Sequence, residues 1–260
     1  MKAIHFFPAV ILAGTLAFVK LGHDVEIKNT KASDYDKPQV RDKIVTLPVY
    51  ATINYNGVLY SDTELKTPVD YLAAGDRVEI LKDKTRKVYY IKHNSRLGWV
   101  DANILNIPPD EPTLKNNLTK EEIESYAQKM RFKSETDYFV WVDIARQRVY
   151  VLKYDDKGVL RLEKNFICAT GMNKSPTTRG YFTISDRGDS FYNPRLKSGA
   201  RYWVRFNGSY LFHSIALNED GSVKDGTLGV RRSDGCVRMS MDDIKWFYEA
   251  VPEGTGVRVN

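Results

Sequence analysis

The sequence predicts a mainly β protein, in which a small β barrel precedes a larger β-rich domain with one late helix. Short runs of β-branched and aromatic residues recur along the 260 residues, and turn residues separate them. A proline cluster at residues 108–112 divides these runs into two groups, of roughly 60 and 120 residues, each long enough to bury its own core. Two folded domains are therefore expected.

The N-terminal residues have the pattern of a targeting segment. After Lys2 an apolar run extends from Phe6 to Val19 and ends before Lys20. This length and flanking charge are typical of a signal peptide or an uncleaved N-terminal membrane anchor, which we predict over residues 1–22. Either segment contacts the membrane at least during export, so we expect the rest of the chain to work outside the cytoplasm. The polar residues 23–43 show no period and are predicted to be a linker.

Charge and cysteine content narrow the class of protein. The formal net charge is +6 and the isoelectric point is near 9.1, which favours an anionic environment. Basic residues are interspersed with acidic ones and no run of five like charges occurs, so we expect no nucleic-acid partner. Cys168 and Cys236 are too few for a disulfide scaffold and lack the spacing of a zinc site, so no metal is expected. One disulfide and two free thiols both fit the sequence.

The first group of β runs occupies residues 44–107. The runs with strand composition are Ile44–Ile53, Arg77–Lys82, Val88–His93 and Gly98–Asp101. A resemblance to the bacterial SH3-like domain lies in the segments Gly75–Leu81, Tyr89–Lys92 and Gly98–Val100. This resemblance implies a small wall-targeting barrel. Trp99 is expected to pack in the core of that barrel rather than to contact a ligand.

Residues 108–137 are predicted to be a linker with a short helix. Thr119 and Glu122 have the spacing of a capping box, in which each side chain bonds the backbone amide of the other residue. Apolar residues at helical intervals then follow as far as Met130. We expect a connector helix over this stretch.

The second domain is predicted over residues 138–260. Its runs with strand composition are Tyr138–Asp143, Arg148–Tyr154, Leu160–Thr170, Gly180–Ser185, Arg201–Phe206 and Tyr210–Ser214. The dipeptide Asn207-Gly208 is a strong hairpin signal between the last two runs. Ser240 and Asp243 have capping-box spacing before apolar residues at helical intervals, which predicts the late helix. A closing strand is expected within Gly254–Val259.

Cys236 is the candidate nucleophile. It follows Gly235, which lets the backbone approach a substrate carbonyl closely, and consecutive amides at such a turn can point at a developing oxyanion. The start of the late helix and nearby cations are expected to lower the pKa of the thiol. These cations are Arg231, Arg232 and Arg238. Cys168 lies instead in the apolar run Phe166–Ala169 and is expected to be a small buried side chain.

His213 is the candidate base. The other three histidines of the chain fall outside the second domain, at His5, His23 and His93. His213 lies near the end of the predicted strand Tyr210–Ser214, from which its ring can project toward a loop. A thiol that is not already ionised needs such a partner to take its proton.

These residues resemble the L,D-transpeptidase catalytic domain, also called the YkuD type. The family pattern is a histidine on a strand, often a glycine, and then a Ser-His-Gly-Cys segment with Arg or Asn shortly after it. Here it corresponds to His213, Gly229 and Ser233-Asp234-Gly235-Cys236. Further similar segments are Ala169–Gly171, Ser175–Thr177, Gly180–Ile184 and Gly254–Val259.

The resemblance implies a cysteine-dependent acyltransferase of peptidoglycan biosynthesis. Cys236 forms a thioester with a donor stem peptide, and an acceptor amine from a neighbouring stem resolves it to a 3→3 cross-link. Water in place of the amine would make the protein an L,D-carboxypeptidase. No metal or organic cofactor is required for this chemistry. Carbapenem β-lactams are expected to acylate Cys236, and the protein is expected to be secreted or membrane-anchored and associated with the cell wall.

The resemblance also implies roles for individual residues. His213 is the implied general base, and Ser214 orients it through its backbone carbonyl. Arg238 and Ser233 are the implied substrate contacts, although a structural ion pair is the alternative for Arg238. The amides implied to bind the oxyanion are those of Asp234, Gly235 and Cys236.

Asp234 departs from the family pattern, which has a histidine at this position. A carboxylate facing the sulfur would raise the pKa of the thiol, so we expect Asp234 to point away or to pair with Arg231 or Arg232. The departure motivates a further hypothesis, a catalytically impaired wall-binding protein. A papain-like endopeptidase is disfavoured, because there the cysteine precedes its histidine, whereas here His213 comes before Cys236.

Overall fold

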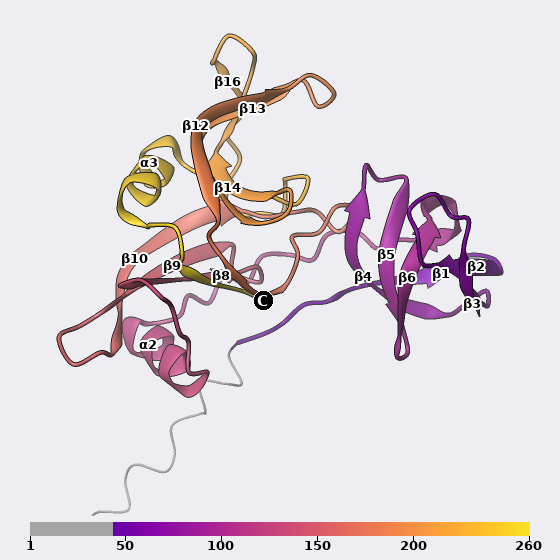
Figure 1. Ribbon diagram of the computed structural model, residues 1–260, viewed down its shortest axis with the longest axis horizontal. Coiled ribbons are helices and arrows are strands. Elements are labelled where there is room, and N and C mark those ends of the chain that lie inside the picture. The colour runs from indigo at the N-terminus through magenta and orange to yellow at the C-terminus, as the bar shows by residue number, and fades with distance from the viewer. Residues whose placement is uncertain (1–43) are drawn as a thin grey trace, which may run out of the picture. The chain divides into compact units, whose positions relative to one another are not determined.

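The computed structural model describes residues 44–260 (Figure 1). The signal peptide or anchor predicted over residues 1–22 and the linker predicted over residues 23–43 lie outside these described residues. Within them, no helix is both long and apolar enough to cross a membrane. The mainly β class is confirmed, and two α-helices accompany the strands in this part of the chain. The domain boundaries given above stay a prediction.

The first sheet contains seven strands of the described chain. They are β1 (Val49–Ile53), β2 (Gly57–Tyr60), β3 (Pro68–Leu72), β4 (Arg77–Lys84), β5 (Val88–His93), β6 (Arg96–Asp101) and β7 (Leu105–Asn106), with a 3-10 turn, η1 (Ala102–Ile104), before the last. Their order is β3-β2-β6-β5-β4-β1-β7 and the pairs are antiparallel. Sequence patterns missed β2 and β3 because each buries one side chain only, Leu59 and Leu72 respectively. The identity of this sheet as an SH3-like barrel stays a prediction.

Alternating side chains of the first sheet form its core. Strand β1, for example, buries every second residue, as one covered face requires. The buried set consists of Val49, Ala51, Ile53, Leu59, Leu72, Val78, Ile80, Tyr89, Ile91, Val100, Ile104 and Leu105. Trp99 is half-buried and lies outside this set, with its ring 5.1 Å from that of Tyr90. The expected core position of Trp99 is therefore wrong, because the alternation of β6 turns Gly98 and Val100 inward instead.

Helix α2 (Lys120–Lys129) has the predicted capping box. The Glu122 amide donates to Thr119 Oγ1 at 3.2 Å, and the Thr119 amide donates to Glu122 Oε2 at 2.9 Å. The apolar side of α2 packs with aromatic residues of the second sheet, where the Tyr126 ring lies 4.8 Å from that of Trp141. The helix therefore covers part of that sheet and is more than a connector.

The second sheet extends over the rest of the chain. Its strands are β8 (Tyr138–Asp143), β9 (Arg148–Tyr154), β10 (Leu160–Ala169), β11 (Gly180–Thr183), β12 (Asp186–Asn193), β13 (Ser198–Asn207), β14 (Tyr210–Ser214), β15 (Ala216–Leu217), β16 (Val223–Asp225), β17 (Val237–Met239) and β18 (Gly256–Val259). The order is β11-β18-β8-β9-β10-β17-β14-β13-β15-β16, and β12 pairs with β13. The predicted hairpin at Asn207-Gly208 joins β13 to β14. Two pairs are parallel, β8 with β18 and β14 with β17.

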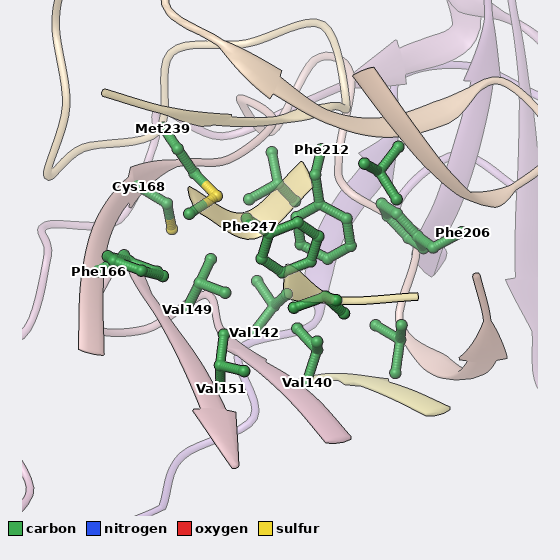
Figure 2. Close-up of a cluster of buried hydrophobic side chains, with 14 of the residues drawn as sticks. Val140, Val142, Val149, Val151, Phe166, Cys168, Phe206, Phe212, Met239 and Phe247 are labelled. Carbon is green, nitrogen blue, oxygen red and sulfur yellow. The ribbon is translucent and has the colours of Figure 1, made fainter. Parts of the chain in front are cut away.

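A dense core supports the strands β14 and β17 from one side. Figure 2 shows side chains of this core, among them Cys168 beside Met239 and the rings of Phe212 and Phe247, whose centroids are 4.8 Å apart. Cys168 is fully buried, which confirms the expectation for this residue. Phe247 belongs to the predicted late helix, α3 (Met241–Ala250), which begins where Ser240 Oγ accepts the Asp243 amide at 3.1 Å. Helix α3 thereby holds the strand that carries His213.

Candidate active site

The parallel pairing of β14 with β17 brings His213 and Cys236 to the same face of the sheet. Phe212 lies opposite Val237 in the ladder, and both side chains are fully buried in the core. Successive side chains of a strand point to opposite faces, so the residues next to this buried pair, His213 and Cys236, both point away from the core. Both line one cavity. The local fold thus joins two residues that are far apart in the sequence.

His213 is buried and its ring is oriented by the backbone of the next residue. Its Nδ1 atom lies 2.7 Å from the Ser214 carbonyl oxygen. A carbonyl oxygen only accepts, so Nδ1 carries the proton and Nε2 of the neutral ring keeps a free lone pair. Burial lowers the pKa of His213 to about 4, and the nearby Arg238 also lowers it. The ring is therefore neutral at neutral pH.

The hydroxyl of Ser214 fixes the position of this strand end. Ser214 Oγ accepts the Arg201 amide at 2.9 Å and donates to the Ile215 carbonyl at 2.9 Å. The first bond ties β14 to β13, and Ser214 is fully buried. The carbonyl that contacts the His213 ring is thus part of a rigid backbone segment.

Cys236 is half-buried, with its Sγ atom 3.6 Å from the Ser209 carbonyl oxygen. Burial raises the pKa of the Cys236 thiol to about 11, against the opposing effects of the Leu211 amide and Arg238. The Asp234 carboxylate raises the pKa as well. The thiol is therefore protonated at neutral pH, and the expectation of a lowered thiol pKa is wrong.

Two of the three cations expected to activate the thiol are engaged elsewhere. Arg231 Nη1 donates to Asn173 Oδ1 at 3.0 Å, and Arg232 Nε donates to Asp225 Oδ2 at 2.8 Å. Desolvation of the sulfur consequently outweighs the remaining positive charge. Arg231 and Arg232 are adjacent in the sequence, but their side chains bind different partners.

The turn that holds Cys236 depends on Gly235. Its φ of +106° lies in the region that favours glycine, and a Cβ at this position would lie 2.8 Å from the Tyr210 ring. The carbonyl oxygen of Gly235 accepts the Thr177 hydroxyl at 2.7 Å, and that same hydroxyl accepts the Gly171 amide at 2.8 Å. A Cβ on Gly171 would lie 2.9 Å from the Gly235 Cα. The segments that contain Gly171 and Thr177 therefore support the turn that holds Cys236, which is called the nucleophile turn below.

Ser233 is fully buried and spans the same turn. Its hydroxyl donates to the Cys236 carbonyl, and the Gly235 amide donates to Ser233 Oγ at 3.2 Å. The structure thus commits this hydroxyl to the shape of the turn. The substrate contact implied for Ser233 and the oxyanion amides implied for Asp234, Gly235 and Cys236 stay predictions.

Arg238 is held by a carboxylate that the sequence did not indicate. Its Nη1 atom lies 3.3 Å from Asp225 Oδ2, at the end of β16, and Arg232 shares the same oxygen. Hydrogen bonds from Thr227 and then the Arg232 side chain hold the pKa of Asp225 well below its usual range. Arg238 Nε is buried, and among the described residues it has no hydrogen-bond partner. Asp225 lies in a polar segment without motif, so no sequence signal could have found it.

Asp234 pairs with Arg86, a residue of the turn between β4 and β5. The expectation of a partner in Arg231 or Arg232 is therefore wrong. Arg86 precedes Asp234 by more than half of the chain, so local sequence could not reveal the pair.

The cavity above Cys236 and His213 has a volume of about 660 Å³ and carries charges of both signs. Its cationic lining residues are Arg86, Arg195, Arg205, Lys224 and Arg238, and its carboxylates are Asp83, Asp225 and Asp234. No group of three or more histidine, cysteine, aspartate or glutamate side chains within residues 44–260 is placed to hold a metal ion. A thiol and a neutral imidazole that open into one such cavity make a candidate site for acyl transfer.

Comparison with known proteins shows which family the second part of the chain resembles. Residues 137–259 match the model of the L,D-transpeptidase catalytic domain, YkuD. YciB of Bacillus subtilis, provisionally described as an L,D-transpeptidase, is 30% identical over 129 residues, which cover 46% of this chain and 66% of that protein, just under two thirds. The family model covers just under half of this chain, and with this relative it shows that residues 137–259 are similar to L,D-transpeptidase catalytic domains.

Solved structures similar to this chain include a fused Zn-dependent amidase/peptidase/peptidoglycan-binding domain-containing protein from Clostridium acetobutylicum. The identity is 33%, the TM-score is 0.46, and the match covers 54% of this chain and 59% of that one. An L,D-transpeptidase (Yku) from Stackebrandtia nassauensis has 23% identity and a TM-score of 0.39, with 50% of this chain and 58% of that one covered.

Proposed function

We propose that the protein is a peptidoglycan L,D-transpeptidase that uses Cys236 as its nucleophile and His213 as its general base. One observation carries this proposal: the pairing of β14 with β17 directs both side chains, Cys236 and His213, into one cavity. The hydrogen bond from His213 Nδ1 to the Ser214 carbonyl supports it, because it leaves Nε2 as the acceptor for the thiol proton.

The protonation states of the two groups define the order of events. Both the thiol and the imidazole are neutral at neutral pH, since burial raises the pKa of Cys236 to about 11 and lowers that of His213 to about 4. Proton transfer from Sγ to Nε2 therefore accompanies attack on the substrate, in place of a resting thiolate–imidazolium pair. Sγ bonds to the carbonyl carbon of the third stem residue, the bond to the terminal D-alanine nitrogen breaks, and that nitrogen takes the proton from His213.

The second step resolves the thioester. An acceptor amine attacks the same carbonyl carbon and loses a proton to His213 Nε2. The carbon–sulfur bond breaks, and the departing sulfur recovers the proton from His213. The product is a 3→3 cross-link and the enzyme returns to its starting state. The amides of Asp234 and Cys236 are the proposed oxyanion donors in both steps, because the Gly235 amide already donates to Ser233 Oγ.

The charges of the cavity support a peptide substrate of this kind. Stem peptides carry carboxylates and an amine, and the cavity presents both cations and carboxylates. Arg238 is the proposed contact for a substrate carboxylate, because its side chain lines the cavity and is held there by the Asp225 carboxylate. The proposed location is extracytoplasmic and wall-associated, with the N-terminal segment in contact with the membrane at least during export.

Two alternatives share the same site. Hydrolysis of the thioester gives an L,D-carboxypeptidase, and the mixed charge of the cavity fits both acceptors. A catalytically impaired wall-binding protein is the other, motivated by Asp234 in place of the family histidine. The Asp234–Arg86 pair weighs against it, because this contact sets a cation beside the added carboxylate and offsets part of its charge.

Incubation with a disaccharide tetrapeptide, followed by mass analysis of the products, tests the proposal. A cross-linked dimer supports the transpeptidase and a disaccharide tripeptide supports the carboxypeptidase. Cys236→Ala is expected to abolish product, whereas the matched variant Cys168→Ala, which removes the other thiol of the chain, is expected to retain it. Product formed by Cys236→Ala, or no product from the folded wild-type protein, contradicts the proposed function.

A further inference from the structure

The turn between β4 and β5 is built from two residues in a strained conformation. Thr85 and Arg86 have φ values of +57° and +58°, and the Lys87 amide donates to the Lys84 carbonyl at 3.1 Å, which closes a two-residue hairpin turn. Such turns favour Asn and Gly, so two side-chain-bearing residues here cost conformational energy. The Arg86 amide is also held by Asp83 Oδ2 at 2.7 Å. The tip of this hairpin therefore presents its side chains in a defined direction.

Three contacts join this hairpin to the loops that support the nucleophile turn. The described residues all belong to one compact unit, which includes both partners of each contact. Tyr89 Oη donates to the Lys174 carbonyl at 2.8 Å, Ser175 Oγ donates to Asp83 Oδ1, and Arg86 pairs with Asp234. Burial raises the pKa of Tyr89 to about 12, so its hydroxyl stays a donor at neutral pH.

The contacted loop is the one that shapes the Cys236 turn. Ser175 is buried, and its carbonyl oxygen would lie 2.2 Å from a Cβ on Gly171, which in turn packs against Gly235. Asp83 therefore contacts a segment that is tightly packed under the nucleophile. A second ionic contact lies nearby, where Arg179 Nη2 is 3.6 Å from Glu79 Oε1 of β4.

Arg86 and its partner Asp234 both line the cavity that contains the sulfur. Asp234 lies two residues before Cys236, and Asp83, Thr85 and Arg86 line the same cavity as the thiol. Both partners of the Arg86–Asp234 pair are more than a third exposed, so the pair adds little to folding stability. Its consequence is local, because the pair directs the carboxylate toward the hairpin and sets a cation beside it.

We propose that the β4–β5 turn forms a wall of the substrate cavity and that Arg86 is a positioning residue, which holds the Asp234 carboxylate toward the hairpin and away from Cys236. A residue of the first sheet's β4–β5 turn then influences the reactivity of Cys236, which belongs to the second sheet. Asp234, which breaks the family pattern, and Arg86 act as one unit. The proposal rests on the proposed function only in taking Cys236 as the reacting group.

Alkylation of Cys236 by iodoacetamide, measured against pH, tests this inference without any peptidoglycan substrate. A Cys168→Ala background leaves Cys236 as the only thiol of the chain. In this background Arg86→Ala leaves Asp234 uncompensated, which opposes the thiolate and is expected to slow alkylation roughly threefold near pH 8, a shift of about half a pKa unit. Lys87→Ala removes an adjacent positive charge from the same turn and serves as the matched control, with an unchanged profile.

The double variant shows whether Arg86 acts through Asp234. In an Asp234→Asn background, Arg86→Ala is expected to have no effect on the alkylation profile. The inference is overturned if Arg86→Ala behaves like Lys87→Ala, or if it slows alkylation equally in the Asp234→Asn background, since the effect would then come from disturbed folding. An Arg86-dependent profile in a protein that leaves tetrapeptide unchanged refutes the proposed function alone. Product formation with an Arg86-independent profile refutes this inference alone.

Discussion

The ring of His213 and the carbonyl of Ser214 are joined by a hydrogen bond of 2.7 Å, between side chain and backbone of consecutive residues. The Ser214 hydroxyl accepts the Arg201 amide of β13, which helps to fix this backbone segment, so the tautomer of the ring is set by the fold and needs no carboxylate partner. An orienting group supplied by the main chain cannot be removed by mutation of its side chain. The base must therefore be tested by replacing His213 itself.

His213→Gln is expected to reduce the turnover of tetrapeptide by two to four orders of magnitude, roughly what loss of a positioned general base costs. Alkylation of Cys236 at high pH should persist, because the thiol then ionises without assistance. His93→Gln, which changes a histidine of the first sheet, is the matched control and should keep wild-type turnover. Equal losses in the two variants would count against His213 as the base.

The buried imidazole makes stability depend on acidity. The pKa of His213 is lowered from 6.5 to about 4, so the unfolded chain binds the proton more readily between these values. Its contribution to stability is fully present above pH 6.5 and is lost as pH falls toward 4, by about 3 kcal/mol in total. Urea denaturation at several pH values should show this loss for the wild type. A matching slope in His213→Gln would show that other groups cause it.

The raised pKa of Cys236 predicts the opposite slope at alkaline pH. The thiol ionises near 9 when unfolded and near 11 when folded, so stability is complete below pH 9 and declines as pH rises toward 11. The unfolding free energy of Cys236→Ala should decline less over this range than that of the wild type. Cys168→Ala is not a suitable control here, because burial raises the pKa of that thiol too.

Gly235→Ala is expected to combine backbone strain with a steric clash. The φ of +106° disfavours any side chain, and the new Cβ would lie 2.8 Å from the Tyr210 ring. Gly75→Ala is the matched control, since Gly75 has a φ of +90° but a Cβ added there would meet nothing within 4 Å. We expect Gly75→Ala to cost about 1 kcal/mol of stability and Gly235→Ala to cost more and to lose most turnover. Equal effects of both variants on turnover would contradict the packing argument.

Asp225→Asn removes the anchor of Arg238. Arg238 then loses its ion pair at 3.3 Å and samples more than one orientation in the cavity, which should lower kcat/KM for the tetrapeptide by about tenfold. Asp156→Asn removes an exposed carboxylate from the turn between β9 and β10 and is the control. Steady-state kinetics of both variants decide the point, and unchanged kcat/KM in Asp225→Asn would remove Arg238 from the proposed substrate contacts.

Sequence patterns were sufficient for those parts of the site that depend on few residues. His213 could be proposed as the base because its domain has no other histidine, and Cys236 because it follows a glycine in a polar segment. The partners of Asp234 and Arg238 could not be predicted. Arg86 reaches the site from the turn between β4 and β5 and Asp225 from the end of β16, and nothing in their own neighbourhoods marks them.

The thiol pKa shows a second limit of sequence patterns. Nearby arginines suggested a lowered value, but Arg231 and Arg232 bind Asn173 and Asp225, and burial then dominates. Similarly, Trp99 was expected in the core of the first sheet, but the alternation of β6 turns Gly98 and Val100 inward instead. In both cases the direction of a side chain decided the outcome, and that direction depends on pairing across the sheet.

The short parallel ladder between β14 and β17 holds the reacting pair in place, independently of the chain that connects the two residues. Three rungs join β14 to β17 beside His213 and Cys236, whereas the exposed residues 218–222 between them line no part of the cavity. This exposed tip can therefore change in length or composition while the ladder that holds the base and the nucleophile stays the same. Exchange of residues 218–222 between relatives should thus leave the chemical step intact.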